Sequence, residues 1–309
     1  MERLLSLIKA MADPTRLRLL NLCARSDLAV VDLTSILAQS QPRLSRHLKI
    51  LSQAGLLERR SEGQRGYFSL TSEPKIRDFA KQILSDIPSD DKVLERDNER
   101  LAALLAARAK LADNYFDKHA RNWHQVRSLY NDDSESENLF IAQLKKQQPI
   151  ARYLDCGTGT GRMLQLAAPF VAQALGVDNS REMLTIARAT LDKNDIQNAL
   201  VQEADLYALP FQAQSFDAIG FYQVLHFLEN PQLAIAQAAQ VLKPQGRLYV
   251  LDYNQHNKQE LAREYAHVWL GFDDAELREW LAQAKLEWQE KIITRQAQPQ
   301  VNLWIAQKP

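Results

Sequence analysis

The chain has 309 residues, 46% of them hydrophobic and 25% charged, which suits two domains with packed cores. The formal net charge is zero, and two isolated cysteines, Cys23 and Cys156, exclude a disulfide framework and a cysteine-rich metal cluster. No signal peptide or long apolar span is evident, so we expect a cytoplasmic protein without a membrane partner.

Positive charge is concentrated at the N-terminal end. Residues 1–73 hold eleven Lys and Arg residues against seven acidic residues, a local excess of four positive charges. The rest of the chain carries the opposite excess. This asymmetry suggests a polyanionic partner for the N-terminal part alone.

Apolar residues at helical spacing predict four helices in this part. The expected helices cover residues 4–11, 15–24, 30–38 and 42–55. In the fourth, Leu44, Leu48 and Leu51 share one face, Ser40 is a suitable N-cap, and Gly55 ends the helix. Its polar and basic residues then point outward, and those expected to contact the partner are Gln41, Arg43, Ser45, Arg46, His47 and Lys49.

Residues 56–70, LLERRSEGQRGYFSL, alternate as two short strands around a Glu-Gly turn. Arg59, Arg60 and Arg65 lie near the tip of this hairpin, and we expect Arg60 and Arg65 to contact DNA phosphates. A basic helix followed by a basic hairpin fits a winged helix-turn-helix, whose helix enters the major groove while the wing contacts the backbone.

Residues 1–70 resemble ArsR-type winged-helix regulators, notably in the runs ADPTRLRLL, SRHLKIL, AGLLERR and GYFSL. Proteins of that family are dimers, so the resemblance implies a homodimer that reads a palindromic DNA operator. Metal-sensing members carry a cysteine pair in the third helix. Ala29 and Val31 stand at the matching positions here, so we expect no metal site.

The next segment is expected to be helical. Residues 75–87 suit a helix that completes a dimer interface, and residues 90–122 carry apolar side chains at heptad-like spacing. We expect the latter helix to pack on its own neighbours or on a dimer mate. Residues 132–137, DDSESE, are interpreted as a solvated loop. The predicted domains are therefore a winged helix over 1–73, a helical linker and dimerisation region over 74–122, and a third domain over 123–309.

The run Tyr153 to Arg162, YLDCGTGTGR, predicts a buried strand, a tight glycine turn and the start of a helix. Glycines are needed where a ligand lies against the backbone, and the free N–H groups of the helix start face the same place. A dinucleotide fingerprint beginning at Gly157 would require glycine at position 162, where the chain has Arg162. The spacing therefore argues against a dinucleotide.

Alternating strands and helices follow this turn. A helix is expected over 163–175, a strand ends in Asp178, another ends in Asp205, and further strands lie within 215–228 and 241–253. Asp178 is placed to accept hydrogen bonds from a ribose. This order predicts a doubly wound α/β sheet whose ligand lies at the carboxyl ends of the strands.

From about Asp113 to Lys308 the chain resembles class I S-adenosylmethionine-dependent methyltransferases. The resemblance rests on the glycine turn, the two strand-end acids and the LPF and SFD runs. It implies a seven-stranded Rossmann-like domain that binds S-adenosylmethionine or S-adenosylhomocysteine. The turn would hold the methionine part of the ligand, Asp178 the ribose hydroxyls, and the Asp205-Leu206 pair the adenine. The expected contacts are Asp155, Gly157, Thr158, Gly159, Gly161, Asp178, Asn179, Asp205, Leu206 and Tyr222.

No catalytic residue is assigned from the sequence. His226 is a candidate base, but a lone histidine beside a pocket is more often structural. Asp252 and Tyr253 end a strand where such enzymes sometimes keep catalytic groups, although their spacing shows no role. Beyond them we expect a helix-like stretch over 260–272, a capped helix after Asp273, and two last strands, the final one antiparallel.

Two functions remain open. The first is a transcriptional repressor whose methyltransferase-like domain senses S-adenosylmethionine or S-adenosylhomocysteine, since the resemblance suggests regulators of methionine-cycle genes. The alternative is an active methyltransferase for a small molecule, with a DNA-binding domain that regulates its own operon. A third reading, a metal-responsive regulator, is disfavoured by Ala29 and Val31.

Overall fold

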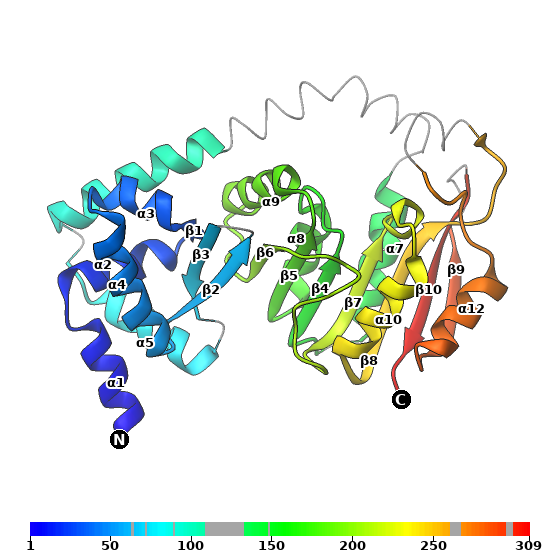
Figure 1. Ribbon diagram of the computed structural model, residues 1–309, viewed down its shortest axis with the longest axis horizontal. Helices are drawn as coiled ribbons and strands as arrows, with labels where there is room; N and C mark the ends of the chain where they lie inside the picture. Colours follow the sequence, from blue (N-terminus) through cyan, green and yellow to red (C-terminus); the bar gives the residue numbers. More distant parts are fainter. Residues whose placement is uncertain are drawn as a thin grey trace. The chain divides into compact units, whose positions relative to one another are not determined.

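The computed structural model describes residues 1–62, 65–71, 73–88, 90–108, 133–147, 149–259, 267–294 and 299–309 (Figure 1). The chain folds into two compact units, Met1–Lys110 and Leu111–Pro309. Among the described residues, no helix is both long and apolar enough to cross a membrane.

The first unit consists of helices around a small three-stranded sheet of order β1-β3-β2. Its elements are α1 (Glu2–Met11), α2 (Pro14–Cys23), β1 (Leu28–Ala29), α3 (Val30–Leu37), α4 (Gln41–Gln53), β2 (Leu57–Glu62), β3 (Arg65–Leu70) and α5 (Pro74–Ser85). The expected helix over 42–55 is confirmed as α4, with Leu44, Leu48 and Leu51 buried. Gly55 ends it with φ +80°, a left-handed conformation that favours glycine.

Residues 92–108 form one more helix of the first unit. Leu101 is 3% exposed within the core that α2 and α4 also build. The guanidinium of Arg18 on α2 donates to both carboxylate oxygens of Asp97, over 2.6 and 2.7 Å. For this part of residues 90–122, packing on the helix's own domain is therefore confirmed. Residues 109–122 lie outside the described residues.

The second unit is built on a seven-stranded sheet of order β6-β5-β4-β7-β8-β10-β9. The strands are β4 (Arg152–Cys156), β5 (Gln173–Asp178), β6 (Ala199–Glu203), β7 (Phe216–Tyr222), β8 (Leu242–Tyr253), β9 (Glu287–Ile293) and β10 (Val301–Gln307). The pairs among β4, β5, β6, β7 and β8 are parallel, whereas β10 is antiparallel to both neighbours. The predicted doubly wound α/β architecture is confirmed, including the antiparallel last strand.

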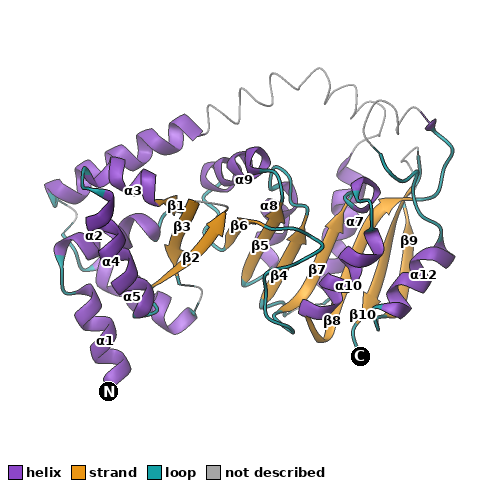
Figure 2. Cartoon of the chain, viewed as in Figure 1, coloured by secondary structure: helices purple, strands orange, loops and turns teal. Residues whose placement is uncertain are grey.

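Helices cover both faces of this sheet (Figure 2). One apolar core joins the sheet to α7 (Asp133–Lys146), α8 (Arg162–Ala167) and α9 (Arg181–Lys193). The other joins it to α10 (Pro231–Val241) and α12 (Asp274–Gln283). Alternate residues of each strand supply the two cores, because successive side chains of a strand point to opposite faces. The loops at the carboxyl ends of β4, β5, β7 and β8 are therefore held by a rigid frame.

Four sequence-based expectations of secondary structure need correction. The helix expected over 163–175 ends at Ala167 and continues only as a short 3₁₀ turn, η1 (Ala168–Phe170), because Pro169 cannot continue an α-helix. The residues after it join β5. Within the expected loop over 132–137, the described residues 133–137 are not a solvated loop, since α7 begins at Asp133 and Glu137 is 8% exposed. The carboxylate of Glu137 accepts two hydrogen bonds from Arg162, which explains its burial.

The third correction concerns residues 260–272. The described part, residues 267–272, contains no helix and instead forms a bridge between Phe272 and Asn254. Residues 260–266 lie outside the described residues. The strand expected to end in Asp205 ends at Glu203, so Asp205 stands in the turn that follows.

Candidate functional site

The glycine turn lies at the carboxyl end of β4. The backbone N–H groups of Gly157 and Thr158 both donate to the carbonyl of Val177 on β5, over 2.8 and 2.9 Å. A Cβ on Gly161 would lie 3.1 Å from Cβ of Ala187 in α9, so this glycine permits close packing. A Cβ on Gly159 would meet nothing within 4 Å. The space beside the Cα atom of Gly159 is therefore open.

Asp155 lies beneath the turn and is 1% exposed. Its carboxylate accepts hydrogen bonds from the hydroxyls of Thr158, over 2.6 Å, and Tyr153, over 3.3 Å. Burial raises the pKa of Asp155 to about 6, although these two hydrogen bonds favour the charged form and offset part of the effect. The pKa of this buried carboxyl therefore lies closer to neutral pH than that of an exposed aspartate.

Asp178, at the end of β5, is joined directly to the glycine turn. Its Oδ2 accepts the N–H of Gly159 and its Oδ1 accepts the N–H of Ser180, each over 2.9 Å. The structure therefore brings together two predicted site residues, Gly159 and Asp178, from separate stretches of sequence. Asn179 follows with an exposed side chain.

The remaining residues predicted to contact the cofactor lie on separate elements. Asp205 is exposed and accepts the N–H of Tyr207 over 2.8 Å, while Leu206 packs on the core beneath it. Tyr222, the last residue of β7, packs edge-on against Phe140 with ring centroids 5.9 Å apart. A different residue covers the turn: a Cβ on Gly157 would lie 2.6 Å from both methyl groups of Val224. Sequence reasoning missed Val224.

Comparison with known families assigns both units. Residues 154–250 match the family model described as a methyltransferase domain, and residues 13–59 match that of the bacterial regulatory protein arsR family. The chain therefore joins an ArsR-family domain to a class I methyltransferase domain. The predicted combination of the two families is confirmed.

Curated relatives match the methyltransferase domain. The chain is 29% identical over 129 residues to the uncharacterized methyltransferase YcgJ of Bacillus subtilis, covering 40% of this chain and 51% of the relative. It is 34% identical over 137 residues to the uncharacterized protein MJ1123 of Methanocaldococcus jannaschii, covering 44% and 60%. It is 32% identical over 130 residues to the ubiquinone/menaquinone biosynthesis C-methyltransferase UbiE of Teredinibacter turnerae, covering 41% and 52%. The chain thus spans only about half the length of the curated relatives it matches.

Solved structures share the fold of this domain. A geranyl diphosphate methyltransferase in complex with S-adenosylmethionine superposes with a TM-score of 0.50 at 13% identity, covering 57% of this chain and 85% of that one. The crystal structure of YcgJ from Bacillus subtilis gives a TM-score of 0.49 at 19% identity, covering 55% and 98%. At these identities the likeness concerns the fold alone.

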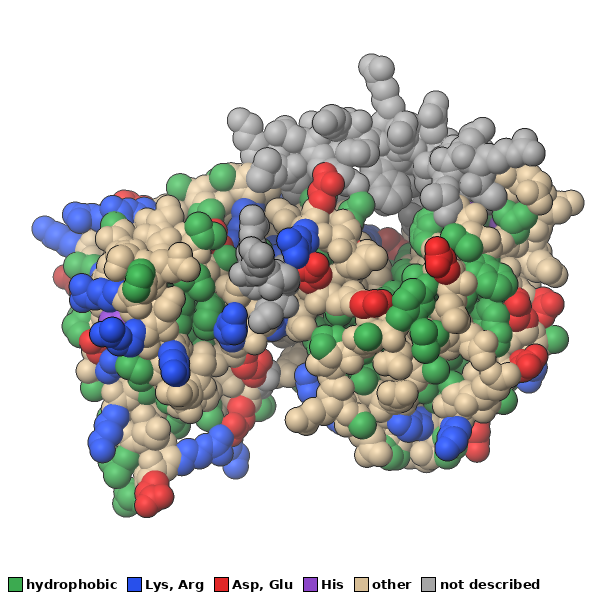
Figure 3. All heavy atoms as spheres, in the orientation of Figure 1, with side chains coloured by type: hydrophobic (Ala, Val, Ile, Leu, Met, Phe, Trp, Pro, Cys, Tyr) green, Lys and Arg blue, Asp and Glu red, His purple; other side chains and the backbone are tan. Residues whose placement is uncertain are grey.

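The ArsR-family domain carries the predicted DNA-binding residues mainly on α4. Exposed side chains are those of Gln41, Arg43, Ser45, Arg46 and Lys49. His47 is half-buried, with its Nδ1 3.7 Å from Oδ1 of Asp13. Figure 3 shows Lys and Arg side chains spread over the visible face of this unit. Five of the six α4 residues predicted to contact DNA are therefore exposed.

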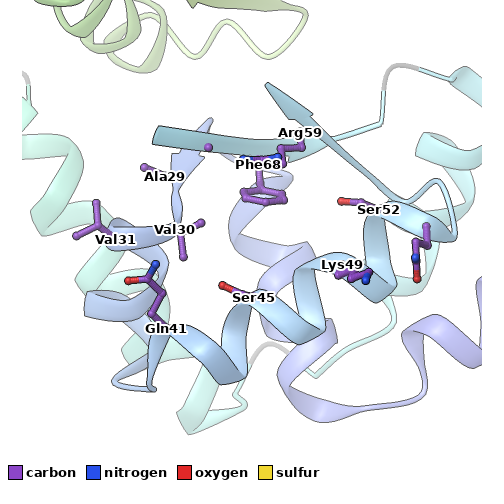
Figure 4. A pocket seen from close by; sticks show the side chains of 11 residues that line it. Ala29, Val30, Val31, Gln41, Ser45, Lys49, Ser52, Arg59 and Phe68 are labelled. Atoms are coloured by element: carbon purple, nitrogen blue, oxygen red, sulfur yellow. The ribbon is translucent and has the colours of Figure 1, made fainter. Parts of the chain in front are cut away.

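A groove of about 730 Å³ runs between α4, the wing strands and the start of α3 (Figure 4). Gln41, Ser45 and Lys49 line it from α4, and Arg59 and Phe68 line it from the wing. The guanidinium of Arg59 lies across Gly66, where a Cβ would be only 2.8 Å from its Nε. Arg59 is thus a wing residue that the predicted contacts omitted.

Arg60 does not occupy the expected position. It is 8% exposed, its guanidinium forms an ion pair of 2.5 Å with Asp27, and it donates to the hydroxyl of Ser69 over 3.0 Å. Because neighbouring strand residues point to opposite faces, Arg59 faces the groove and Arg60 the interior. The side chain of Arg65 lies outside the described part of the chain, so its predicted contact remains a prediction.

A second polar cluster lies in the methyltransferase domain where β7 and β8 end. The Nδ1 of His226, in the 3₁₀ turn η2 (Leu225–Phe227), lies 2.7 Å from Oδ1 of Asp252. Their side chains are 2% and 0% exposed. The ring of His267 lies 4.2 Å from that of His226, and burial lowers the pKa of His267 to about 4. The sequence analysis singled out His226 and Asp252 separately, did not single out His267, and gave no sign that these residues meet.

Proposed function

We propose that this protein is a transcriptional repressor whose methyltransferase domain binds S-adenosylmethionine or S-adenosylhomocysteine as an effector. The exposed basic face of α4 and the groove beside the wing support DNA binding. The open space beside the Cα atom of Gly159 and the strand-end carboxylate of Asp178 support binding of a nucleoside ligand. Control of methionine-cycle genes in the cytoplasm would fit such an effector.

The observation that carries the regulatory proposal is the attachment of helix 92–108 to the helix-turn-helix. Near its end, Arg108 donates to Oδ2 of Asp32 over 2.7 Å, and the same oxygen accepts the N–H of Ala29 at the start of α3. Arg108 also donates to the carbonyl of Asp27 over 3.3 Å. The last described residue before the segment leading to the methyltransferase domain is thus bonded to the first helix of the DNA-binding motif.

The wing belongs to the same network. Asp27 pairs with Arg60 of β2, so Arg108, Asp27 and Arg60 join the helix, the start of α3 and the wing. A displacement of helix 92–108 would therefore act on α3 of the helix-turn-helix and on the wing. The energy required is modest, because a tenfold change in operator affinity corresponds to about 1.4 kcal/mol of differential binding.

A homodimer is part of this proposal. On α1, Leu4, Leu5 and Ile8 are 46%, 45% and 48% exposed, which is unusual for neighbouring large apolar side chains on one helix. This stripe supports burial against a second copy, as expected from the family resemblance. Two copies would present two α4 helices to a palindromic operator.

The deciding experiment is fluorescence anisotropy of the full-length protein on its own promoter DNA. Titrations with S-adenosylmethionine and with S-adenosylhomocysteine are run separately. A shift in DNA affinity at micromolar ligand supports the proposal, and the stronger effector identifies the signal. Binding of both ligands by calorimetry with an unchanged DNA affinity would contradict it.

A second candidate function is methyl transfer to a small molecule, with autoregulation through the ArsR-family domain. The buried His226–Asp252 pair beside the glycine turn favours it, because a sensor has no need for such a pair. The test is transfer of a labelled methyl group to any component of a metabolite extract. Absence of labelled product across extracts would count against catalysis.

A further inference from the structure

The His226–Asp252 pair lies at the same end of the sheet as the glycine turn. β7 pairs with both β4 and β8 in parallel, so the carboxyl ends of these three strands are neighbours. Val224, which follows β7, lies against Gly157 of the turn, and His226 comes two residues later. Asp252 stands near the end of β8. The pair therefore occupies the sheet edge adjoining the place where a methyl donor would lie.

The geometry of the pair selects the tautomer of the neutral imidazole. Asp252 is fully buried and also accepts the backbone N–H of Tyr253 over 2.8 Å, which holds its carboxylate in place. A carboxylate 2.7 Å from Nδ1 of His226 favours the tautomer with the proton on Nδ1. The other nitrogen, Nε2, then carries the lone pair, and it has no hydrogen-bond partner among the described residues. A buried histidine in this tautomer can act as a base, because Nε2 is able to accept a proton from a ligand.

Aromatic rings surround this base. The centroid of the His226 ring lies 4.0 Å from that of Phe227, 5.0 Å from that of Tyr253 and 4.2 Å from that of His267. Phe227 is 48% exposed, which leaves one apolar wall open to a ligand. The neighbouring titratable groups are Asp252, which is engaged by His226, together with Tyr253, His267 and, in contact with Tyr253, His256.

The groups around His226 indicate which class of methyl acceptor fits the site. A planar hydroxyl compound can stack on the rings and give its proton to Nε2. His267 does not compete for that proton at neutral pH, because burial lowers its pKa to about 4.

We propose that His226 is the general base for a methyl acceptor carrying a phenol- or enol-type hydroxyl, and that Asp252 is its positioning residue. Nε2 takes the hydroxyl proton while the oxygen forms a bond to the methyl carbon. The bond from that carbon to the sulfonium sulfur breaks, and its electron pair stays on sulfur, leaving a thioether. The imidazolium is stabilised by Asp252 until its proton passes to water.

This inference rests on the proposed binding of S-adenosylmethionine, but its site can be tested without that ligand. The probe is 4-nitrophenol, whose anion absorbs visible light and whose neutral form does not. The full-length protein is titrated with the probe about one pH unit below the pKa of the phenol. We expect an anion band that saturates with protein concentration, because bound phenol gives its proton to His226.

Variants separate this role from a structural one. The carbonyl of His226 accepts the N–H groups of Val268 and Trp269, so the residue also has a part in holding its loop. His226→Asn keeps an N–H near Asp252 but removes the base, and should lower the anion band at least tenfold. Asp252→Asn should lower it by a similar factor, whereas His256→Asn should leave it unchanged.

An equal anion band in the wild type and His226→Asn, or no binding of the probe, would overturn the proposal. If His226→Asn does not fold, nitrogen-detected NMR of the wild type decides. The Nδ1–H tautomer is expected, and the Nε2–H tautomer would exclude the role of base.

Calorimetry with S-adenosylmethionine separates a failure of this inference from a failure of the proposed function. Wild-type protein that binds the nucleoside but gives no anion band contradicts this inference alone, whereas loss of nucleoside binding contradicts the proposed function.

Discussion

Gly159 donates its backbone N–H to Oδ2 of Asp178 over 2.9 Å, which ties the glycine turn to the end of the neighbouring strand. The other oxygen of Asp178 accepts the N–H of Ser180 at the N-cap of α9. One carboxylate thus orders the turn and the start of a helix while standing where a ribose is expected. Its position before ligand binding is already fixed, so little conformational entropy opposes binding.

Replacing Asp178 by Ala should weaken nucleoside binding. Loss of charge-assisted hydrogen bonds costs roughly 1.5–3 kcal/mol, so we expect a roughly 10- to 100-fold rise in Kd for S-adenosylhomocysteine. The far-ultraviolet circular dichroism spectrum should not change. Glu182→Ala, an exposed acid in the first turn of α9, is the matched control. An unchanged Kd for Asp178→Ala would remove this residue from the ribose role.

The two kinds of arginine in the ArsR-family domain should behave differently. Arg46→Ala removes an exposed charge from α4 and should lower operator affinity and reduce the salt slope by about 1, without altering the melting temperature. Arg60→Ala leaves Asp27 buried without its ion-pair partner and should destabilise the domain by roughly 3 kcal/mol. Arg25→Ala, exposed outside α4 and the wing, controls for net charge. Anisotropy at several salt concentrations and thermal unfolding measure both effects; equal melting temperatures for the Arg46 and Arg60 variants would contradict this assignment.

Arg108→Met should uncouple the effector from DNA binding. The change removes the hydrogen bonds to Asp32 and Asp27 but keeps the aliphatic stem, so the helix should still pack. We expect the same Kd for S-adenosylhomocysteine and a ligand-induced shift in operator affinity at least threefold smaller. Arg96→Met, on the same helix with an exposed side chain, should retain the full shift. A full response in Arg108→Met would show that coupling takes another route.

Binding of S-adenosylmethionine should weaken as the pH falls through about 6. Burial raises the pKa of Asp155 to about 6, so acidification neutralises a carboxylate that attracts the sulfonium charge. S-adenosylhomocysteine lacks that charge and should lose less affinity. Folding stability should change in the opposite direction, because the raised pKa makes the folded state take up a proton before the unfolded state does. Calorimetry from pH 5 to 8 on the wild type and on Asp155→Asn checks this; a parallel pH dependence for both ligands would contradict it.

Local patterns predicted much of the fold. Leu44, Leu48 and Leu51 revealed the buried face of α4 because helical periodicity is a property of neighbouring residues. The glycine turn, Asp155 and Asp178 were equally visible, since strand, turn and helix follow one another within a few residues. The helix expected over 163–175 was wrong because its apolar residues fit a strand as well, and the break at Pro169 decided between them.

The sequence did not reveal which residues from distant parts of the chain come together. Arg59 and Arg60 are adjacent and identical, and only the pairing of β2 with β3 decides which one faces the groove. His226 and Asp252 are 26 residues apart and meet because β7 and β8 pair in parallel. No spacing in the sequence predicts this contact, because the two residues meet only when the strands that carry them pair.

The sequence by itself determined the two domain families, the glycine turn and the basic character of α4, because each depends on the type and spacing of residues that are close in the sequence. The tertiary structure decided which side chains meet: Arg60 with Asp27, Arg108 with Asp32, and His226 with Asp252. Their partners come from separate elements, so the contacts exist only once packing has buried the intervening apolar surface. The proposed effector coupling and the proposed base both depend on those contacts.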